Sequence, residues 1–121
     1  MGEYAESFTV DADTKTAEEI SRRYFTGFGF KVLREEGNIV IFEKGSLRRN
    51  IYTFSFEEAY KQAVVSIVGD PEAPVSTVSV SFSLPYLRLR KNDVSAIKSM
   101  IKALRERISI TTGYRVFRER V

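Results

Sequence analysis

The segment from Val78 to Leu84 constrains the fold more than any other part of the sequence. Apolar side chains alternate strictly with serines throughout it. Since successive side chains on a strand point to opposite faces, the pattern predicts a strand with one buried and one solvated face. Such strands are typical of antiparallel sheets that are covered on one side only. The rest of the chain must therefore cover one face of a sheet and leave the other face open.

A long apolar stripe near the end of the chain predicts an element that covers this face. The stripe repeats every three or four residues and consists of Val94, Ile97, Ile101, Leu104 and Ile108. This spacing places all of its members on one side of a helix. Asp93 stands immediately before the stripe and is a good N-cap residue. We therefore expect a second helix that starts after Asp93 and packs on the sheet, although a similar stripe can also serve a partner interface.

The N-terminal part of the chain predicts a strand followed by another amphipathic helix. The residues from Glu6 to Val10 alternate, as expected for a short strand. Thr16 and Glu19 have the spacing of a capping box, which predicts a helix start at Thr16. Apolar residues then follow at helical spacing: Ala17, Ile20, Tyr24 and Phe25. Gly27 and Gly29 predict the end of this helix, because glycine readily adopts the left-handed conformation found there.

Short β-type segments fill the middle of the chain. We expect strands at 30–34, 39–42, 51–56 and 63–68, with turns or loops at 35–38 and 69–74. The order is then strand, helix, four or five strands, helix. Consecutive strands with short connections favour antiparallel neighbours. The sequence therefore predicts an α+β fold, in which two helices pack on one face of an antiparallel sheet of four to six strands.

This order of elements is similar to that of helix-grip domains and of one repeat of TATA-binding-protein-like domains. The resemblance lies in topology alone and implies a fold, not a function. The 121 residues fit one domain, which we place at 1–112. The remaining segment, 113–121, is a basic C-terminal tail, for which disorder and an added edge strand both stay open.

The composition excludes several classes of active site. The chain has no histidine and no cysteine. It therefore lacks the commonest general base, any thiolate nucleophile, any disulfide and the usual ligands of zinc. No G-x-S-x-G, S-x-x-K or phosphate-loop motif is present. We expect no enzymatic activity, no catalytic residue, no bound metal and no cofactor.

Three carboxylate pairs are the remaining candidates for acid–base chemistry or a hard metal ion: Glu18-Glu19, Glu35-Glu36 and Glu57-Glu58. Adjacent residues on a strand point to opposite faces, which separates the members of a pair. The first pair is expected in the first turn of a helix, where acidic residues stabilise the helix dipole. The second pair flanks a predicted turn. Each pair has a structural explanation, so we assign none of them to a site.

The distribution of charge suggests an anionic partner. The net charge is +3, but Tyr86 to Val121 holds 10 Lys and Arg against 3 Asp and Glu. Such asymmetry indicates interaction with an anion, although a solvated helix face gives the same pattern. The candidate contact residues are Arg48, Arg49, Arg88, Arg90, Lys91, Lys98, Lys102 and Arg105. The last three are spaced to lie on one face of the second helix.

These observations support one main hypothesis and two alternatives. The first is a small cytoplasmic interaction module without catalytic activity, which recognises a protein or an anionic partner through the basic third and for which homodimerisation stays open. The second is nucleic-acid binding through the same basic residues, with Tyr52 and Tyr86 stacking on bases. The third is a carrier of an apolar ligand held between sheet and helices. No secretory signal and no apolar run long enough to span a membrane is evident.

Overall fold

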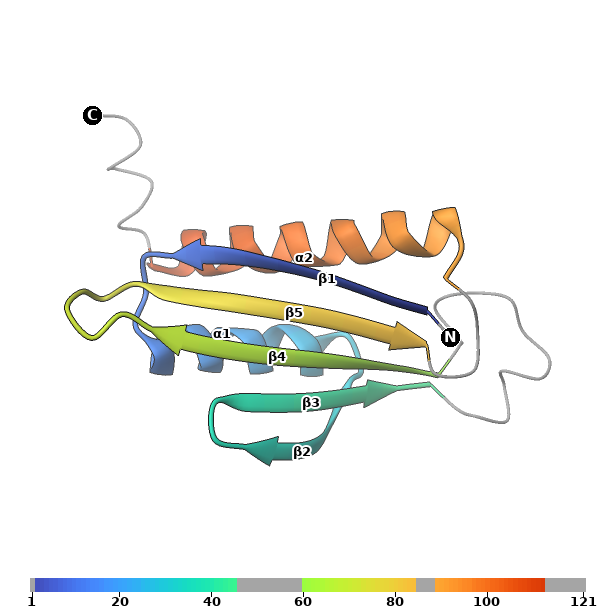
Figure 1. The fold of residues 1–121 in the computed structure, drawn as a ribbon, viewed down its shortest axis with the longest axis horizontal. Helices are drawn as coiled ribbons and strands as arrows, with labels where there is room; N and C mark the ends of the chain where they lie inside the picture. The colour runs from blue at the N-terminus through green and yellow to red at the C-terminus, as the bar shows by residue number, and fades with distance from the viewer. Residues whose placement is uncertain (1, 46–59, 85–88, 113–121) are drawn as a thin grey trace.

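The computed structural model describes residues 2–45, 60–84 and 89–112. Two helices and five strands follow one another as β1 (Gly2–Val10), α1 (Thr14–Gly27), β2 (Lys31–Glu36), β3 (Ile39–Lys44), β4 (Lys61–Gly69), β5 (Ser76–Leu84) and α2 (Lys91–Thr112). The strands form one antiparallel sheet of order β1-β5-β4-β3-β2 (Figure 1). The predicted α+β class is confirmed. The predicted strand at 51–56 and the tail at 113–121 lie outside the described residues.

Both helices cover the same face of the sheet. Tyr4 of β1 lies opposite Phe82 of β5, so their side chains share a face. Phe82 contacts Phe25 of α1, with ring centroids 5.9 Å apart. On the same face, the Lys98 amine of α2 lies 5.8 Å from the centre of the Tyr4 ring. The two helices are joined by the Tyr24 hydroxyl, which donates a hydrogen bond of 2.7 Å to the Met100 carbonyl.

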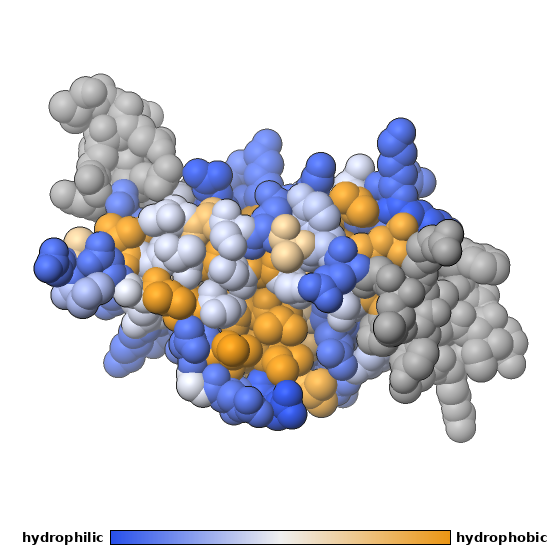
Figure 2. Space-filling view, viewed as in Figure 1, coloured by the Kyte–Doolittle hydropathy of each residue, from blue (hydrophilic) through white to orange (hydrophobic). Residues whose placement is uncertain are grey.

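The alternation in β5 has the predicted consequence. Its apolar residues from Val78 to Leu84 are almost completely buried, whereas the serines between them are half-buried on the other face. On that open face the Ser7 and Ser79 hydroxyls, from paired positions of β1 and β5, lie 2.8 Å apart. Apolar side chains gather over β3 and β4 (Figure 2). In β4, Val68 is 57% exposed.

An aromatic cluster holds α1 on the sheet. The Phe25 ring stacks on Phe42 of β3 at a centroid distance of 4.9 Å. It meets Phe30 edge-on at 5.3 Å, and Phe82 packs against both rings. All four phenylalanines are at most 2% exposed. Because aromatic pairs contribute beyond the area they bury, this cluster is the centre of the core between α1 and the sheet.

The start of α1 differs from the prediction. The N-cap is Asp13, whose carboxylate accepts a hydrogen bond of 2.8 Å from the Thr16 amide. Thr16 is therefore inside the helix, and the capping box with Glu19 is wrong. Both arrangements satisfy an unpaired amide of the first turn, and aspartate is among the best residues for this position. The predicted end is confirmed, since α1 stops at Gly27 and Gly29 has a φ of 89°.

The second helix starts earlier than predicted, at Lys91. Asp93 is not its N-cap but a residue of its first turn. The Asp93 carboxylate reaches back and accepts a hydrogen bond of 2.9 Å from the Arg90 amide. This contact is the half of a capping box that the third helical residue provides. The apolar stripe is confirmed, because from Ile97 to Ile108 its members are at most 3% exposed.

Both edge strands differ from the prediction: β1 is longer than predicted, and β2 is less regular. β1 begins at Gly2 and not at Glu6, and it pairs with β5 along its whole length without interruption. β2 forms the predicted hairpin with β3, but all of its residues are exposed. Its register shifts between Val32 and Arg34, which breaks the alternation expected for 30–34. A bulge of this kind adds a residue and bends the edge of a sheet.

Candidate anion-binding groove

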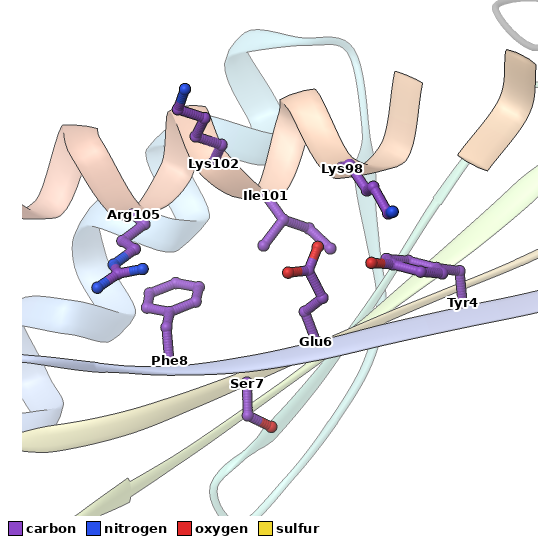
Figure 3. A pocket seen from close by; sticks show the side chains of 8 residues that line it. All are labelled: Tyr4, Glu6, Ser7, Phe8, Lys98, Ile101, Lys102 and Arg105. Carbon is purple, nitrogen blue, oxygen red and sulfur yellow. The ribbon is translucent and has the colours of Figure 1, made fainter. Parts of the chain in front are cut away.

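An open groove of about 440 Å³ runs between β1 and α2. Its lining consists of Tyr4, Glu6, Ser7 and Phe8 from β1, and of Lys98, Ile101, Lys102 and Arg105 from α2. The groove therefore lies along one edge of the sheet, where the C-terminal helix packs over the first strand (Figure 3). Three of the predicted basic residues, Lys98, Lys102 and Arg105, line this groove together with β1.

Simple periodicities bring these side chains together. Tyr4, Glu6 and Phe8 are spaced by two residues, so they share the face of β1 that looks toward α2. On α2, Lys98, Lys102 and Arg105 are spaced by four and three residues, so they share one face of the helix. Ile101 belongs to the buried stripe and is 3% exposed. The groove thus has an apolar floor and a basic wall.

The cations take different orientations in the groove (Figure 3). The Lys98 side chain extends toward Tyr4, and the Arg105 guanidinium lies beside Phe8, whereas the Lys102 amine points away from β1. The contact of Lys98 with the Tyr4 ring is a cation–π interaction. Two of the three positive charges therefore lie near the two ends of the segment from Tyr4 to Phe8, and the Lys102 amine lies on the rim of the groove.

Glu6 is the single acidic residue of the lining. Its side chain projects from β1 between Tyr4 and Phe8 (Figure 3). Desolvation and the nearby Glu6 carboxylate raise the pKa of the Tyr4 hydroxyl. The lining holds three cations and one carboxylate, so the net charge of the groove attracts anions. At the centre of the groove, the Glu6 carboxylate repels them.

The other predicted contact residues are not part of this groove. Arg90 and Lys91 lie at the start of α2, where the Arg90 guanidinium donates a hydrogen bond of 3.2 Å to Asp93. Neither residue lines the groove. The remaining candidates, Arg48, Arg49 and Arg88, lie outside the described residues, as do Tyr52 and Tyr86. The structure therefore brings together the helical triplet Lys98, Lys102 and Arg105.

The contribution of β1 to the groove was not predicted from the sequence. The first strand was expected to begin at Glu6, which left out Tyr4, and no site role was assigned to Glu6. The period-2 pattern that extends from Tyr4 through Phe8 was the available signal. What hid it was Glu6, a charged residue on the face that is otherwise apolar.

The carboxylate pairs have structural roles where they are described. Glu18 forms an ion pair with Arg22 at 2.9 Å, and Arg22 also contacts Glu35, which ties α1 to β2. Glu36 pairs with Arg34 at 3.1 Å. Because α1 starts at Thr14, Glu18 and Glu19 follow the first turn and do not stand in it. Glu57 and Glu58 lie outside the described residues.

Among the described residues, no group of three or more Asp, Glu, His or Cys side chains could hold a metal ion. Within the same residues, neither helix is long and apolar enough to cross a membrane.

A buried lysine stands on the core face of the sheet. Lys61 is 1% exposed and lies opposite Lys44 in the β3–β4 ladder. The Lys44 amine is 5.6 Å from the centre of the Phe30 ring. Like charges at paired positions are destabilising unless other groups compensate them, and both lysines take part in further interactions. We therefore treat this pair as part of the fold.

Comparison with known proteins adds a likeness of fold. No protein-family model and no curated protein matches the chain. Among solved structures, an uncharacterised protein of Bacillus thuringiensis has a TM-score of 0.52 and 11% identity, covering 91% of this chain and 98% of its own. Ara h 8.0201 has a TM-score of 0.50 and 9% identity, covering 94% of this chain and 97% of its own. At these identities the likeness shows the fold alone.

Proposed function

We propose that the chain is a small binding module that recognises an anionic partner in the groove between β1 and α2. The observation that carries the proposal is the meeting of Lys98, Lys102 and Arg105 with the aromatic residues of β1 around one groove. Aromatic and apolar surface in such a groove supplies contact area, and the cations supply attraction and orientation. The proposed role is binding, without catalysis of its own.

Two features support anion binding over a merely solvated helix face. The cations border a hollow surface, which focuses their field more than a convex surface does. Neither Lys98, Lys102 nor Arg105 forms an ion pair with a described residue at 4 Å or less.

Titration with tripolyphosphate tests this proposal without assuming a class of partner. We expect saturable binding that shifts the NMR signals of the backbone amides along β1 and α2. Affinity should fall steeply as salt is raised, because binding rests on charge. The triple variant Lys98→Gln, Lys102→Gln, Arg105→Gln should lose at least about tenfold in affinity, the equivalent of about 1.4 kcal/mol.

A matched control removes the same charge elsewhere. Lys15→Gln, Arg23→Gln, Lys31→Gln changes three exposed cations on α1 and β2, outside the groove. This control should keep most of the affinity of the unaltered chain. Equal losses in the two triple variants would show that only net charge matters, and the groove would then not be the binding site.

The proposed lack of catalysis is tested separately. It rests on the absence of histidine and cysteine from the sequence. We expect no hydrolysis of p-nitrophenyl acetate or p-nitrophenyl phosphate above the rate in buffer. Turnover that disappears on a single substitution in the groove would contradict this part of the proposal.

A further inference from the structure

We infer that the partner is an extended peptide that adds a strand to the outer edge of β1, with acidic side chains at its two ends and a basic or neutral one at its centre. This inference rests on the proposed function and specifies the chemistry of the partner. It follows from two properties of the groove: its position on an edge strand, and the order of charges along it.

The edge of β1 is suited to strand addition. Among the described strands, β1 pairs with β5 alone, and its register is regular from Gly2 to Val10. An edge strand presents a row of unpaired amide and carbonyl groups, on which an extended peptide can form main-chain hydrogen bonds. The opposite edge differs, because β2 carries a bulge and four charged residues. Bulges and charges are common ways to block such pairing.

The charges along the groove define which side chains the added strand would carry. Three of its residues would stand beside Tyr4, Glu6 and Phe8, at intervals of about 6.8 Å. Lys98 reaches toward the first of these positions and Arg105 toward the last (Figure 3). Both outer positions therefore favour an acidic side chain. The central position faces the Glu6 carboxylate, so it favours a basic or neutral one, since like charges directly opposite are destabilising.

A second copy of the chain fits this edge less well. Pairing of β1 with β1 of another copy around a two-fold axis would place both α2 helices on the same face of the joined sheet. The basic residues Lys98, Lys102 and Arg105 would then face the same residues of the other copy, with a single Glu6 per copy to offset them. The groove is complementary to an acidic segment and not to itself.

Nucleic acid also fits less well. A single strand carries a negative charge at every nucleotide, so its backbone would pass Glu6 as well as the cations. It would also leave the main-chain groups of β1 without hydrogen bonds from a strand. A peptide can instead place a neutral or basic residue opposite Glu6 and use the strand edge.

Two fluorescein-labelled heptapeptides with blocked ends test the predicted charge order. The lysine-centred peptide is Thr-Glu-Thr-Lys-Thr-Glu-Thr, and the all-glutamate peptide is Thr-Glu-Thr-Glu-Thr-Glu-Thr. In fluorescence anisotropy titrations of the full chain, we expect the lysine-centred peptide to bind about threefold to fivefold more tightly, although it carries less negative charge. The effect corresponds to one cross-strand charge pair. Tighter binding of the all-glutamate peptide would overturn the proposed order of charges.

Variants of the chain locate the effect. Glu6→Gln should remove the preference between the two peptides. Lys98→Glu and Arg105→Glu should each weaken binding of the lysine-centred peptide by about tenfold, because each replaces a close positive charge with a negative one. Arg23→Glu, an exposed position on α1 outside the groove, makes the same change of charge and should have little effect. If Arg23→Glu weakens binding as much, the peptide does not lie in this groove.

Methylation of the peptide backbone tests strand addition itself. In an added strand, every second amide points toward β1 and the others point to solvent. N-methylation of the residues in one alternating set should therefore abolish binding, while methylation of the other set is tolerated. Equal tolerance of both sets would rule out strand addition.

The outcomes separate this inference from the proposed function. If neither peptide binds, while the binding of tripolyphosphate still requires Lys98, Lys102 and Arg105, the groove binds anions but not an extended peptide. The same conclusion follows if single-stranded oligothymidylate binds there more tightly than both peptides. If tripolyphosphate binding is also independent of these residues, the proposed function fails as well.

Discussion

At the scale of single residues, the structure depends on a few polar groups that sit where an element starts. Asp13 caps α1 through the Thr16 amide, and the buried Ser76 hydroxyl donates a hydrogen bond of 2.7 Å to the Ala12 carbonyl. The second bond ties the connection between β1 and α1 to the start of β5. Both contacts satisfy backbone groups that would otherwise lack a partner, which is costly near the core.

Asp13 should make part of the stability dependent on pH. Its hydrogen bonds with Thr16 lower the pKa of the Asp13 carboxyl in the folded state. A lowered pKa means that the contribution is complete above the unfolded value of about 3.9 and is lost as pH falls through the folded value. We expect Asp13→Ala to lower the urea midpoint at about pH 7, and to do so less at about pH 3. Asp13→Asn should keep most of the cap but lose this pH dependence; a loss of stability with Asp13→Ala that is the same at both pH values would contradict the assignment.

Gly69 allows α1 to approach the end of β4. A Cβ atom added at Gly69 would lie 2.6 Å from the Thr14 Cγ2 atom. We expect Gly69→Ala to lower the free energy of unfolding by about 1–3 kcal/mol, measured by chemical denaturation. Combination with Thr14→Ala should restore much of the loss. Gly27→Ala is the control, because nothing lies within 4 Å of its added Cβ, and it should be neutral or slightly stabilising.

At the scale of elements, the two helices are held by different means. α1 rests on the sheet through Phe25 and the rings around it, whereas α2 rests on its aliphatic stripe. The hydrogen bond from Tyr24 to Met100 connects the helices directly. The position of α2 over β1 is what forms the groove, so the packing of α2 and the proposed site are linked.

Removal of the hydroxyl that joins the helices should have a moderate cost. The Tyr24 hydroxyl donates its proton to the Met100 carbonyl, and burial raises its pKa, an effect that Arg107 partly offsets. Tyr24→Phe should lower the free energy of unfolding by about 0.5–1.5 kcal/mol, which is typical for one hydrogen bond. Tyr4→Phe serves as a comparison for the loss of a phenol hydroxyl at a less buried position. If Tyr4→Phe lowers the free energy of unfolding more than Tyr24→Phe does, the hydrogen bond between the helices is not the more important of the two hydroxyl contacts.

At the scale of the whole molecule, one core joins both helices and the described strands other than β2. Buried apolar residues from every element except β2 form a single cluster. Phe82 lies near its centre, contacts both Phe25 and Phe30, and is completely buried. A domain with one such core is expected to unfold in a single cooperative transition.

A substitution at the centre of this core should affect the entire molecule. Phe82→Ala should cost about 3–5 kcal/mol and shift one cooperative thermal transition. Phe28→Ala removes the same group at a position that is 48% exposed, and it should cost far less. Two separate transitions in Phe82→Ala, followed by circular dichroism, would argue against a single core.

Local periodicity was enough to predict the class of fold and much of its detail. The alternation in β5, the stripe of α2 and the glycine after α1 each depend on neighbours along the chain, and each was predicted correctly. The errors occurred at element ends: Asp13 and not Thr16 caps α1, and Asp93 lies within the first turn of α2. Whether β2 would be buried could not be predicted, because an exposed edge strand and a covered one share the same local pattern.

The candidate site was predicted in part for the same reason. The sequence by itself determined that Lys98, Lys102 and Arg105 share a helix face, since helical geometry fixes the neighbours at three and four residues. It could not determine what faces them. Only the tertiary structure placed Tyr4, Glu6 and Phe8 beside them, because α2, near the other end of the chain, packs against β1. Contacts across such a sequence distance depend on how the whole core packs, which no local pattern specifies.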